Sequence, residues 1–547
     1  MRILLPLLLA SLPLSLVGVT AKCQAAAEPA AQAALDPCER LGALAIPNAS
    51  ITMATEVPAG TFSGPPQAFT GLDISAFYKK LPAFCRVVAH AHPSADSDIV
   101  VEVWMPLAGW NGKLQGLGNG GFAGLIDYFE LGAAIAKGYA AVATDTGHAG
   151  SPVDAAWALG HPEKIADFGH RGIHEMTRTA KIAVHEFYSS GPRRSYFAGC
   201  SDGGREALME AERYPTDYDG ILAGAPANYW TALLSLAAID TQALTATPES
   251  FIPQSKIPVI AGAVRAACDS LDGVKDGILN DPRQCRFDPA SIQCKPGDDT
   301  ATCLTASQAT ALKAIYAGLK DSSGRSIFPG YLPGAEDGQG GWGLWITGPA
   351  PGRSLMAAFG NGYFTDMVYN DPHWDMKTFS LESGLNTAKT RTAEALDATN
   401  PDLTAFRSHG GKLILYHGWD DPAIPALNTV HYYESLGAKM GGTATSSFVR
   451  LYMLPGVQHC AGGTGADDVG SSGASRSTDP GHNARLALED WVEKGTAPEA
   501  LIATKRNEAD HSPSMTRLLC PYPQSAKYNG SGDPNGASSY ACAVPAQ

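Results

Sequence analysis

Three observations predict an α/β fold in which a parallel sheet is flanked by helices. Short apolar segments with strand character recur at 99–105, 113–117, 139–143 and 194–198. A helical pattern at 173–188 separates the last two, and alternation of strands with helices favours a parallel sheet. The chain has 547 residues, more than one compact core usually uses, so we expect a main domain with a large insertion.

The most informative motif has the form G-x-S-x-G and places Ser201 between Gly199 and Gly203. The strand at 194–198 precedes it and a helical segment at 205–211 follows it, which is the context of a nucleophile elbow. Glycines on both sides allow a sharp turn that exposes the serine hydroxyl at the top of the sheet. The motif alone is common, but in this context it predicts a nucleophilic serine.

Two later segments supply the partners that such a serine needs. An apolar strand that begins at Lys412 ends in a turn carrying Asp420 and Asp421, and a strand at 448–454 is followed by His459. A hydroxyl is a weak nucleophile, so it needs an imidazole base that a carboxylate orients. Each residue alone is more often a turn residue. In the order serine, acid, histidine, which is that of α/β-hydrolases, they predict a triad of Ser201, Asp421 and His459.

A glycine-rich turn at 118–122 follows an early strand and is a candidate for the oxyanion hole. Such a hole needs two backbone N–H groups aimed at the developing negative charge. We expect one from Asp202, the residue after the nucleophile, and the other from Gly120 or Gly121. Glycine suits this place because no Cβ blocks the approach of an ester carbonyl.

Cysteines flank two of the three triad candidates. Cys200 directly precedes the serine and Cys460 directly follows the histidine, so a disulfide between them is geometrically reasonable if serine and histidine are in contact. This Cys-Ser…Asp…His-Cys arrangement resembles the tannase and feruloyl esterase family, which includes mono(2-hydroxyethyl) terephthalate hydrolase. The motifs that carry the resemblance lie at 199–205, 417–422 and 458–460.

The resemblance extends from about Cys38 to Cys542 and implies an α/β-hydrolase with a large inserted lid domain. Asp420 adds a second acid beside Asp421, and the family spacing HGWxDP favours Asp421 as the orienting carboxylate. The implied activity is that of a serine carboxylic-ester hydrolase acting on esters of aromatic acids, of the gallate, ferulate or terephthalate half-ester type.

The substrate ring is expected between the lid and the hydrolase domain. Arg353 is a candidate partner for a charged acid group, and His417 either lines the pocket or only holds the turn before Asp421. Aromatic residues of the lid are each more often core than substrate contacts, and the candidates are Trp342, Trp345, Phe359, Tyr363, Phe364, Tyr369 and Trp374.

Within the lid, the segment 269–278 carries three aspartates, spaced three and four residues apart with glycines among them, and lies between Cys268 and Cys285. Carboxylates at such short spacing can wrap a hard cation, although the spacing is not that of an EF-hand. A solvated acidic turn is the ordinary interpretation of such a cluster. The resemblance implies structural calcium instead, held by the side chains of Asp269, Asp272 and Asp276 and by the carbonyls of Val274 and Ile278.

Residues 1–25 have a short basic start and an apolar stretch typical of a secretory signal peptide, which predicts export to the periplasm or the medium. Of eleven cysteines, Cys23 falls in this leader, and the even number that remains suggests disulfides in an oxidising compartment. The resemblance implies the pairs Cys38–Cys85, Cys200–Cys460, Cys268–Cys285, Cys294–Cys303 and Cys520–Cys542.

The expected domains are a hydrolase part at 26–228, a lid with the calcium loop at 229–400 and a second hydrolase part at 401–547. The formal net charge of −14 argues against nucleic acid or anionic membrane as a partner. The resemblance implies a small aromatic ester as the substrate. Beyond the leader, no uninterrupted apolar stretch is long enough to cross a bilayer.

Two other classes of function fit the same sequence. A secreted serine peptidase, esterase or lipase of other specificity would use the same triad, although no long hydrophobic lid helix is evident. A non-catalytic binding protein on a hydrolase scaffold is the second class. The presence of all three triad candidates argues against it, because degenerate scaffolds usually lose one.

Overall fold

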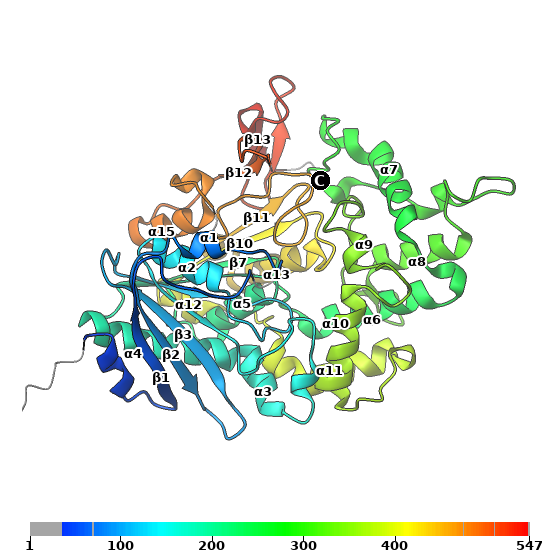
Figure 1. Cartoon of the computed structure of the whole chain (residues 1–547). Helices are drawn as coiled ribbons and strands as arrows, with labels where there is room; N and C mark the ends of the chain where they lie inside the picture. Colours follow the sequence, from blue (N-terminus) through cyan, green and yellow to red (C-terminus); the bar gives the residue numbers. More distant parts are fainter. Residues whose placement is uncertain (1–35, 68–69, 474, 508, 545–547) are drawn as a thin grey trace, which may run out of the picture. The chain divides into compact units, whose positions relative to one another are not determined.

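The structure is a computed structural model that describes residues 36–67, 70–473, 475–507 and 509–544. Pro37–Gln547 form one compact unit, which is described here by itself (Figure 1). The predicted leader at 1–25 lies outside the described residues.

A nine-stranded sheet forms the centre of this unit, in the order β1-β2-β3-β5-β4-β6-β7-β10-β11. Pairing is antiparallel from β1 to β5 and parallel from β5 to β11. The strands are β1 Ala49–Val57, β2 Phe84–Ala91, β3 Ile99–Pro106, β4 Lys113–Leu117, β5 Ala140–Thr144, β6 Arg194–Cys200, β7 Gly220–Gly224, β10 Lys412–Gly418 and β11 Val449–Leu454.

The predicted α/β class is therefore confirmed, with a mixed rather than wholly parallel sheet. Each strand expected from an apolar run is present. Strands β1, β2 and β7 were not predicted. Strand β1 alternates exposed with half-buried residues at the edge of the sheet and carries no apolar run. Strands β1, β2 and β3 form an antiparallel meander, which does not depend on the strand–helix alternation used for the prediction.

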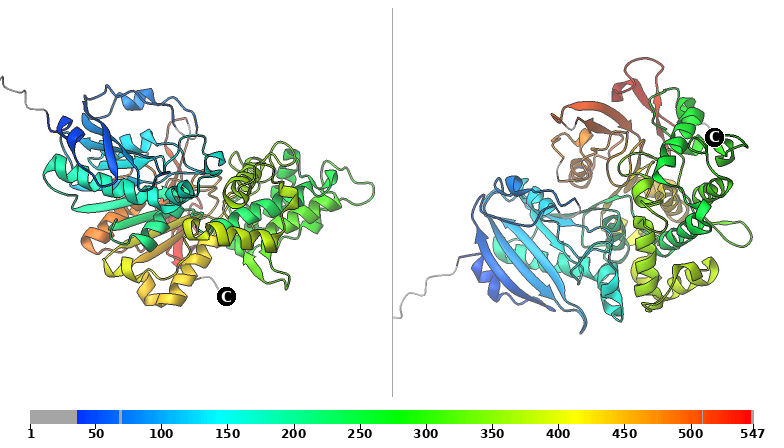
Figure 2. Two further views of the ribbon diagram at one scale, coloured as in Figure 1. Left: turned by 90° about the horizontal axis from the view of Figure 1, so that it is seen from below. Right: turned by 45° about the vertical axis from the view of Figure 1, so that its right-hand side comes forward.

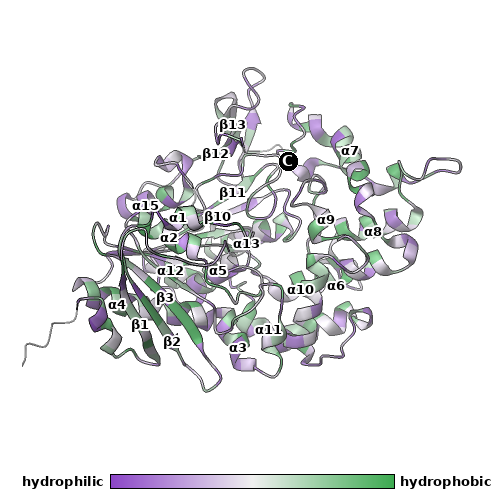
Figure 3. Ribbon diagram, viewed as in Figure 1, coloured by the Kyte–Doolittle hydropathy of each residue, from purple (hydrophilic) through white to green (hydrophobic). Residues whose placement is uncertain are grey.

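Helices cover both faces of the sheet because its strands alternate two apolar sets of side chains. On one face, Val101 and Val103 of β3 belong to a buried cluster that includes side chains of α4 (Gly172–Tyr188), α5 (Asp202–Arg213) and α13 (Ala426–Met440). On the other, Trp104 belongs to a cluster that includes side chains of α2 (Tyr128–Ala136) and α15 (Ala484–Lys494). Strand β3 is accordingly largely hydrophobic in Figure 3, since it is covered on both sides.

The segment expected as a lid is helical and lies beside the sheet, green to yellow-green in Figures 1 and 2. Its ends are held together where the chain leaves and re-enters the sheet region: Ala398 N donates to Asn228 O over 2.8 Å. Its helices are α6 Trp230–Thr245, α7 Ile257–Cys268, α8 Ala306–Ala317, α9 Trp342–Trp345, α10 Leu355–Gly362 and α11 Leu381–Leu396, with the short strands β8 Leu319–Lys320 and β9 Ser326–Phe328.

The remaining elements are short helices and two C-terminal hairpins. Within the described ranges, no helix is both long and apolar enough to span a membrane. These elements are α1 Ser75–Tyr78, α3 Pro162–Ala166, α12 Thr404–Ser408, α14 Gly442–Ser446, β12 Leu501–Arg506, β13 Pro513–Leu519, β14 Ser525–Tyr528 and β15 Tyr540–Ala543.

Five disulfides join the same ten cysteines that the family resemblance pairs. Cys38–Cys85 ties the N-terminal segment to β2, and Cys520–Cys542 joins the end of β13 to β15. Cys268–Cys285 and Cys294–Cys303 lie within the insertion, and Cys200–Cys460 connects residues 260 apart in sequence.

Candidate active site

Ser201 lies on a sharp turn between β6 and α5. Its backbone has a φ of 66°, which residues other than glycine rarely adopt. The flanking glycines are required by close backbone packing. A Cβ on Gly199 would meet Gly203 O at 2.5 Å, and one on Gly203 would meet Asn119 O at 2.7 Å. The local sequence thus folds as the predicted elbow.

The three predicted triad residues come together at the carboxyl ends of their strands. The Ser201 hydroxyl lies 2.9 Å from His459 Nε2, and His459 Nδ1 lies 2.8 Å from Asp421 Oδ2. With Nδ1 donating to the carboxylate, Nε2 is free to accept from the serine hydroxyl. This is the arrangement in which an imidazole can remove the serine proton.

Asp421 is fully buried, yet its carboxylate is well supplied with donors. Its Oδ1 accepts from the backbone N–H groups of Ala423 and Ile424, at 2.8 and 2.9 Å. Burial acts to raise the pKa of Asp421, but the charge of His459 and the hydrogen bond from His417 outweigh burial and hold the pKa below its ordinary value. Asp421 therefore stays ionised beside the imidazole.

His417 lies behind Asp421 and does not line the cavity at the serine. Its Nε2 is 3.1 Å from both Asp421 Oδ2 and Ile424 O. Because a carbonyl only accepts, Nε2 carries the proton and Nδ1 accepts from the Thr429 hydroxyl, 2.7 Å away. Of the two roles expected for His417, the structure supports holding the turn that carries Asp421.

Asp420 points away from the triad and toward the acidic side of the insertion. Its Oδ1 is buried and has no hydrogen-bond partner in the part of the chain that the structure describes. Burial, followed by the nearby charges of Glu336 and Asp337, raises the pKa of Asp420 well above its ordinary value. Of the two adjacent acids, only Asp421 contacts His459.

The glycine turn lies against the elbow, as an oxyanion hole requires. Gly121 lines the cavity at Ser201, has a φ of 60°, and a Cβ there would meet Pro152 O at 2.2 Å. Among the described residues, the backbone N–H groups of Gly121 and Asp202 have no hydrogen-bond acceptor. Gly120 is not among the cavity residues, so Gly121 is the better placed of the two predicted donors.

A cavity of about 50 Å³, called here the serine cavity, lies beside the triad and is walled by the insertion. Trp345 stands at its edge and contacts the His459 ring edge-on, with centroids 5.0 Å apart. The lining residues are Gly121, Ser201, Asp202, Ala227, Trp230, Leu233, Leu234, Trp345, Met356, Phe359, Ala423 and Ile424.

Only two of the seven aromatic candidates, Trp345 and Phe359, reach the serine cavity. Trp342, Tyr363 and Phe364 are fully buried in the core of the insertion, and Tyr369 stacks on Trp374 at 5.3 Å. The sequence did not distinguish the aromatic residues that line the serine cavity from those buried in the core of the insertion. The sequence interpretation also missed the wall of the cavity formed by α6, an apolar helix that begins shortly after β7.

Arg353 does not lie in the serine cavity. It lines a separate, larger cavity of about 1150 Å³ in the insertion, together with Gln254 and Lys377. Helix α10 lies between the two spaces, since Met356 and Phe359 face the serine cavity whereas Ala357 and Ala358 line the larger one. The expectation that Arg353 contacts the acid part of the substrate at Ser201 is therefore not supported.

The candidate calcium ligands lie on the loop after α7. Asp272 accepts from the backbone N–H of Val274 and of Asn280, and Asp276 Oδ2 pairs with Arg517 at 2.9 Å. The oxygen donors suit a hard cation. The carboxylates are instead bound to backbone N–H groups and Arg517, and the described residues contain no group of three or more His, Cys, Asp or Glu side chains arranged for a metal. Calcium stays a prediction.

The model of the family described as "Tannase and feruloyl esterase" matches residues 85–543. The chain belongs to the tannase and feruloyl esterase family. This confirms the resemblance carried by the cysteine-flanked serine and histidine.

Members of the family from bacteria and fungi are similar over most of their length. An uncharacterised esterase of Xanthomonas campestris is 38% identical, with 92% of this chain and 91% of the relative covered. A probable feruloyl esterase B-1 of Aspergillus terreus is 34% identical, with 84% and 86% covered. The crystal structure of feruloyl esterase B from Aspergillus oryzae has a TM-score of 0.85 at 28% identity, covering 93% and 99%.

The structure of a tannin acyl hydrolase from Aspergillus niger shares the fold, with a TM-score of 0.71 at 22% identity over 91% of this chain and 92% of that one. As a member of the tannase and feruloyl esterase family, this protein is a carboxylic-ester hydrolase.

Proposed function

We propose that this esterase cleaves esters of aromatic acids through an acyl-enzyme formed on Ser201. The observation that carries the proposal is the continuous contact from Ser201 Oγ through the His459 ring to Asp421, at 2.9 and 2.8 Å. The aromatic walls of the serine cavity, Trp345 and Phe359, support a flat ring as the acyl group.

In this mechanism, Ser201 Oγ attacks the ester carbonyl while His459 Nε2 takes the hydroxyl proton. Asp421 fixes the ring and stabilises the imidazolium that forms. The backbone N–H groups of Asp202 and Gly121 stabilise the oxyanion. The proton on Nε2 passes to the leaving alcohol as the C–O bond breaks, and water then hydrolyses the acyl-enzyme with His459 again as the base.

The test is turnover of an ester panel by the wild-type protein and by Ser201→Ala. The panel contains methyl gallate, methyl ferulate, mono(2-hydroxyethyl) terephthalate and a long-chain nitrophenyl ester. Serine-dependent turnover of an aromatic ester supports the proposal. Turnover of the long-chain ester alone would indicate a lipase. Absence of all turnover, with no labelling of Ser201 by a fluorophosphonate, would indicate a binding protein.

We also propose that the loop at Asp269–Ile278 holds one structural calcium ion. Support comes from its oxygen donors and from Cys268–Cys285, which closes the loop at its base. Metal analysis of the purified protein should find about one calcium per chain, and removal with EGTA should lower Tm. A metal-free protein whose Tm does not respond to added calcium would contradict this proposal.

We also propose that the protein is exported, because its chain carries several disulfides. Five bridges within one chain are typical of proteins that fold in an oxidising compartment. Sequencing the N-terminus of the protein recovered from periplasm and medium would locate it. A full-length N-terminus in the cytoplasm would contradict export.

A further inference from the structure

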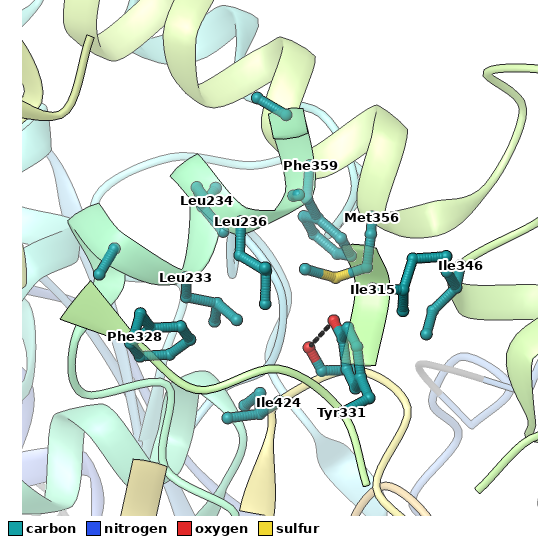
Figure 4. Close-up of a cluster of buried hydrophobic side chains, with 14 of the residues drawn as sticks. Leu233, Leu234, Leu236, Ile315, Phe328, Tyr331, Ile346, Met356, Phe359 and Ile424 are labelled. Carbon is teal, nitrogen blue, oxygen red and sulfur yellow. Dashed lines mark hydrogen bonds between the residues drawn. The ribbon is translucent and has the colours of Figure 1, made fainter. Parts of the chain in front are cut away.

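The chemical character of the residues that line the serine cavity bears on which acid part of the ester can bind there. Apart from the backbone of Gly121 and the Ser201 hydroxyl, the lining side chains are apolar or aromatic, with one exception, Asp202. In Figure 4, Leu233 of α6, Met356 of α10 and Ile424 of the loop after β10 point toward one common space from three separate elements.

The Asp202 carboxylate is 1% exposed, and its Oδ1 forms an ion pair with Arg205 Nε at 2.7 Å. Its Oδ2 is buried and has no hydrogen-bond partner among the described residues, so this side chain adds a hydrogen-bond acceptor and no positive charge to the lining. Arg205 is fully buried, lies against the ring of Trp230 at 5.4 Å, and also donates to the carbonyls of Phe168 and Gly169. The guanidinium therefore has its partners within the protein, with Trp230 over it.

None of the described residues that line the serine cavity carries a positive charge that could pair with a carboxylate of the substrate. Arg353, the residue expected to meet a carboxylate, lines the other cavity, beyond α10. Among the described residues, the indole Nε1 of Trp230 is a buried donor without an acceptor. A single neutral N–H does not offset the cost of removing a carboxylate from water. Ring hydroxyl groups buried here without partners would also weaken binding.

We propose that the serine cavity selects an aromatic acyl group that is uncharged and has few hydroxyl groups. The preferred acids are of the benzoate or cinnamate type, and esters whose acyl part carries a free carboxylate or several ring hydroxyls are disfavoured. This inference rests on the proposed function, because it requires the acyl part to enter the serine cavity.

Matched ester pairs test this selectivity. Dimethyl and monomethyl terephthalate share the ring and the leaving methanol and differ in one negative charge. Methyl benzoate and methyl gallate differ in three hydroxyl groups. Values of kcat/KM are measured near pH 6, where gallate phenols are neutral. To remove intrinsic reactivity, each value is divided by the non-enzymatic hydrolysis rate of the same ester, which is alkaline for the terephthalates and acid-catalysed for the benzoate and gallate, so that the phenols stay neutral.

We expect the anionic terephthalate to be cleaved at least about 100-fold less efficiently than the neutral diester. Methyl gallate should be cleaved at least about 10-fold less efficiently than methyl benzoate. Normalised values within about fivefold in both pairs would overturn the inference while leaving serine-dependent ester hydrolysis intact. Equal, background rates for the wild type and Ser201→Ala on all four esters would instead overturn the proposed function.

A lysine in the lining of the serine cavity tests the effect of a positive charge on selectivity. Met356→Lys should shift the ratio of monomethyl to dimethyl terephthalate at least about 10-fold toward the anion. Met356→Leu controls for packing, and Arg353→Ala, in the other cavity, should leave the ratio unchanged. A lower ratio in Arg353→Ala would show that this arginine does reach the acyl group, against the inference. If Met356→Lys does not fold, the wild-type ratios decide alone.

Discussion

The backbone N–H of Asn119 donates to Glu206 Oε2 over 2.8 Å, so the glycine turn beside Ser201 is held by the helix that follows the serine. Gly203 N also donates to Asn119 O, at 2.9 Å. Glu206 is fully buried, and burial together with the charge of Asp202 raises its pKa well above the ordinary value. Its carboxyl group therefore acts on the oxyanion turn as a hydrogen-bond acceptor.

This contact predicts that Glu206 positions the oxyanion turn. Glu206→Leu leaves the Asn119 N–H without its acceptor and should lower kcat roughly 10- to 100-fold, with KM changed less than about threefold. Glu206→Gln keeps an acceptor oxygen and should restore kcat to within about fivefold. Steady-state kinetics below Tm checks this. Equal kcat for the leucine and glutamine variants would show that the contact is only structural.

Replacement of Asp421 and of Asp420 by asparagine should have different effects on kcat. Asp421→Asn removes the charge that orients His459 and should lower kcat by roughly 10³- to 10⁴-fold. Asp420→Asn removes a buried carboxyl with an unpartnered oxygen, so it should leave kcat within about threefold and not lower Tm. A large loss of kcat in Asp420→Asn, with Asp421→Asn active, would reverse the assignment.

The Cys200–Cys460 disulfide joins the two loops that carry the nucleophile and the base. Its cysteines are 6.0 Å apart between Cα atoms and separated by 260 residues. In the chain-entropy model, closing so long a loop stabilises the fold by about 5–6 kcal/mol. Cys200→Ala with Cys460→Ala should therefore lower Tm.

Because the same bridge tethers both loops, activity should also fall at temperatures where the double variant is folded. We expect a decrease in kcat of roughly 10-fold, since small displacements of reacting groups are costly. The matched control is Cys520→Ala with Cys542→Ala, far from the triad in sequence. If the two double variants retain the same kcat below Tm, the bridge at the active site serves stability only.

Asp145 predicts a pH dependence of stability. Burial raises its pKa to about 7, although N–H groups of Gly147 and Val100 donate to its Oδ1 and act to lower it. Since the folded-state pKa is above the ordinary value, the folded state favours the protonated acid. Asp145 therefore makes its full contribution to the free energy of unfolding below about pH 4, and this contribution is lost as the pH rises to about 7.

Asp145→Asn keeps the acceptor oxygen and cannot ionise. We expect no gain in Tm at pH 4 and a gain of roughly 2–6 °C at pH 7.5 relative to the wild type. Differential scanning calorimetry at both pH values checks this. A Tm difference that is the same at both pH values would contradict the raised pKa.

Much of the site was predictable because its residues are adjacent to strand ends. Ser201, Asp421 and His459 each follow an apolar run, and parallel strands bring their carboxyl ends to one edge of the sheet. The edge strand β1 was not predictable in this way, because its alternating exposed and half-buried residues give no apolar run. Glu206 carried no signal either, since a glutamate on a helix is ordinarily solvated.

The sequence by itself determined the α/β class, the order of the triad and the place of the glycine-rich turn, because each depends on local chain direction and on motifs only a few residues long. The tertiary structure decided which of two adjacent acids contacts His459, that His417 supports Asp421, and that Arg353 lies apart from Ser201. These outcomes depend on how α6, α10 and the loop after β10 pack together. The packing of these elements joins segments that are far apart in the sequence, and the contact of His417 with Asp421 depends on how the turn between them folds. Neither follows from a local pattern of residues.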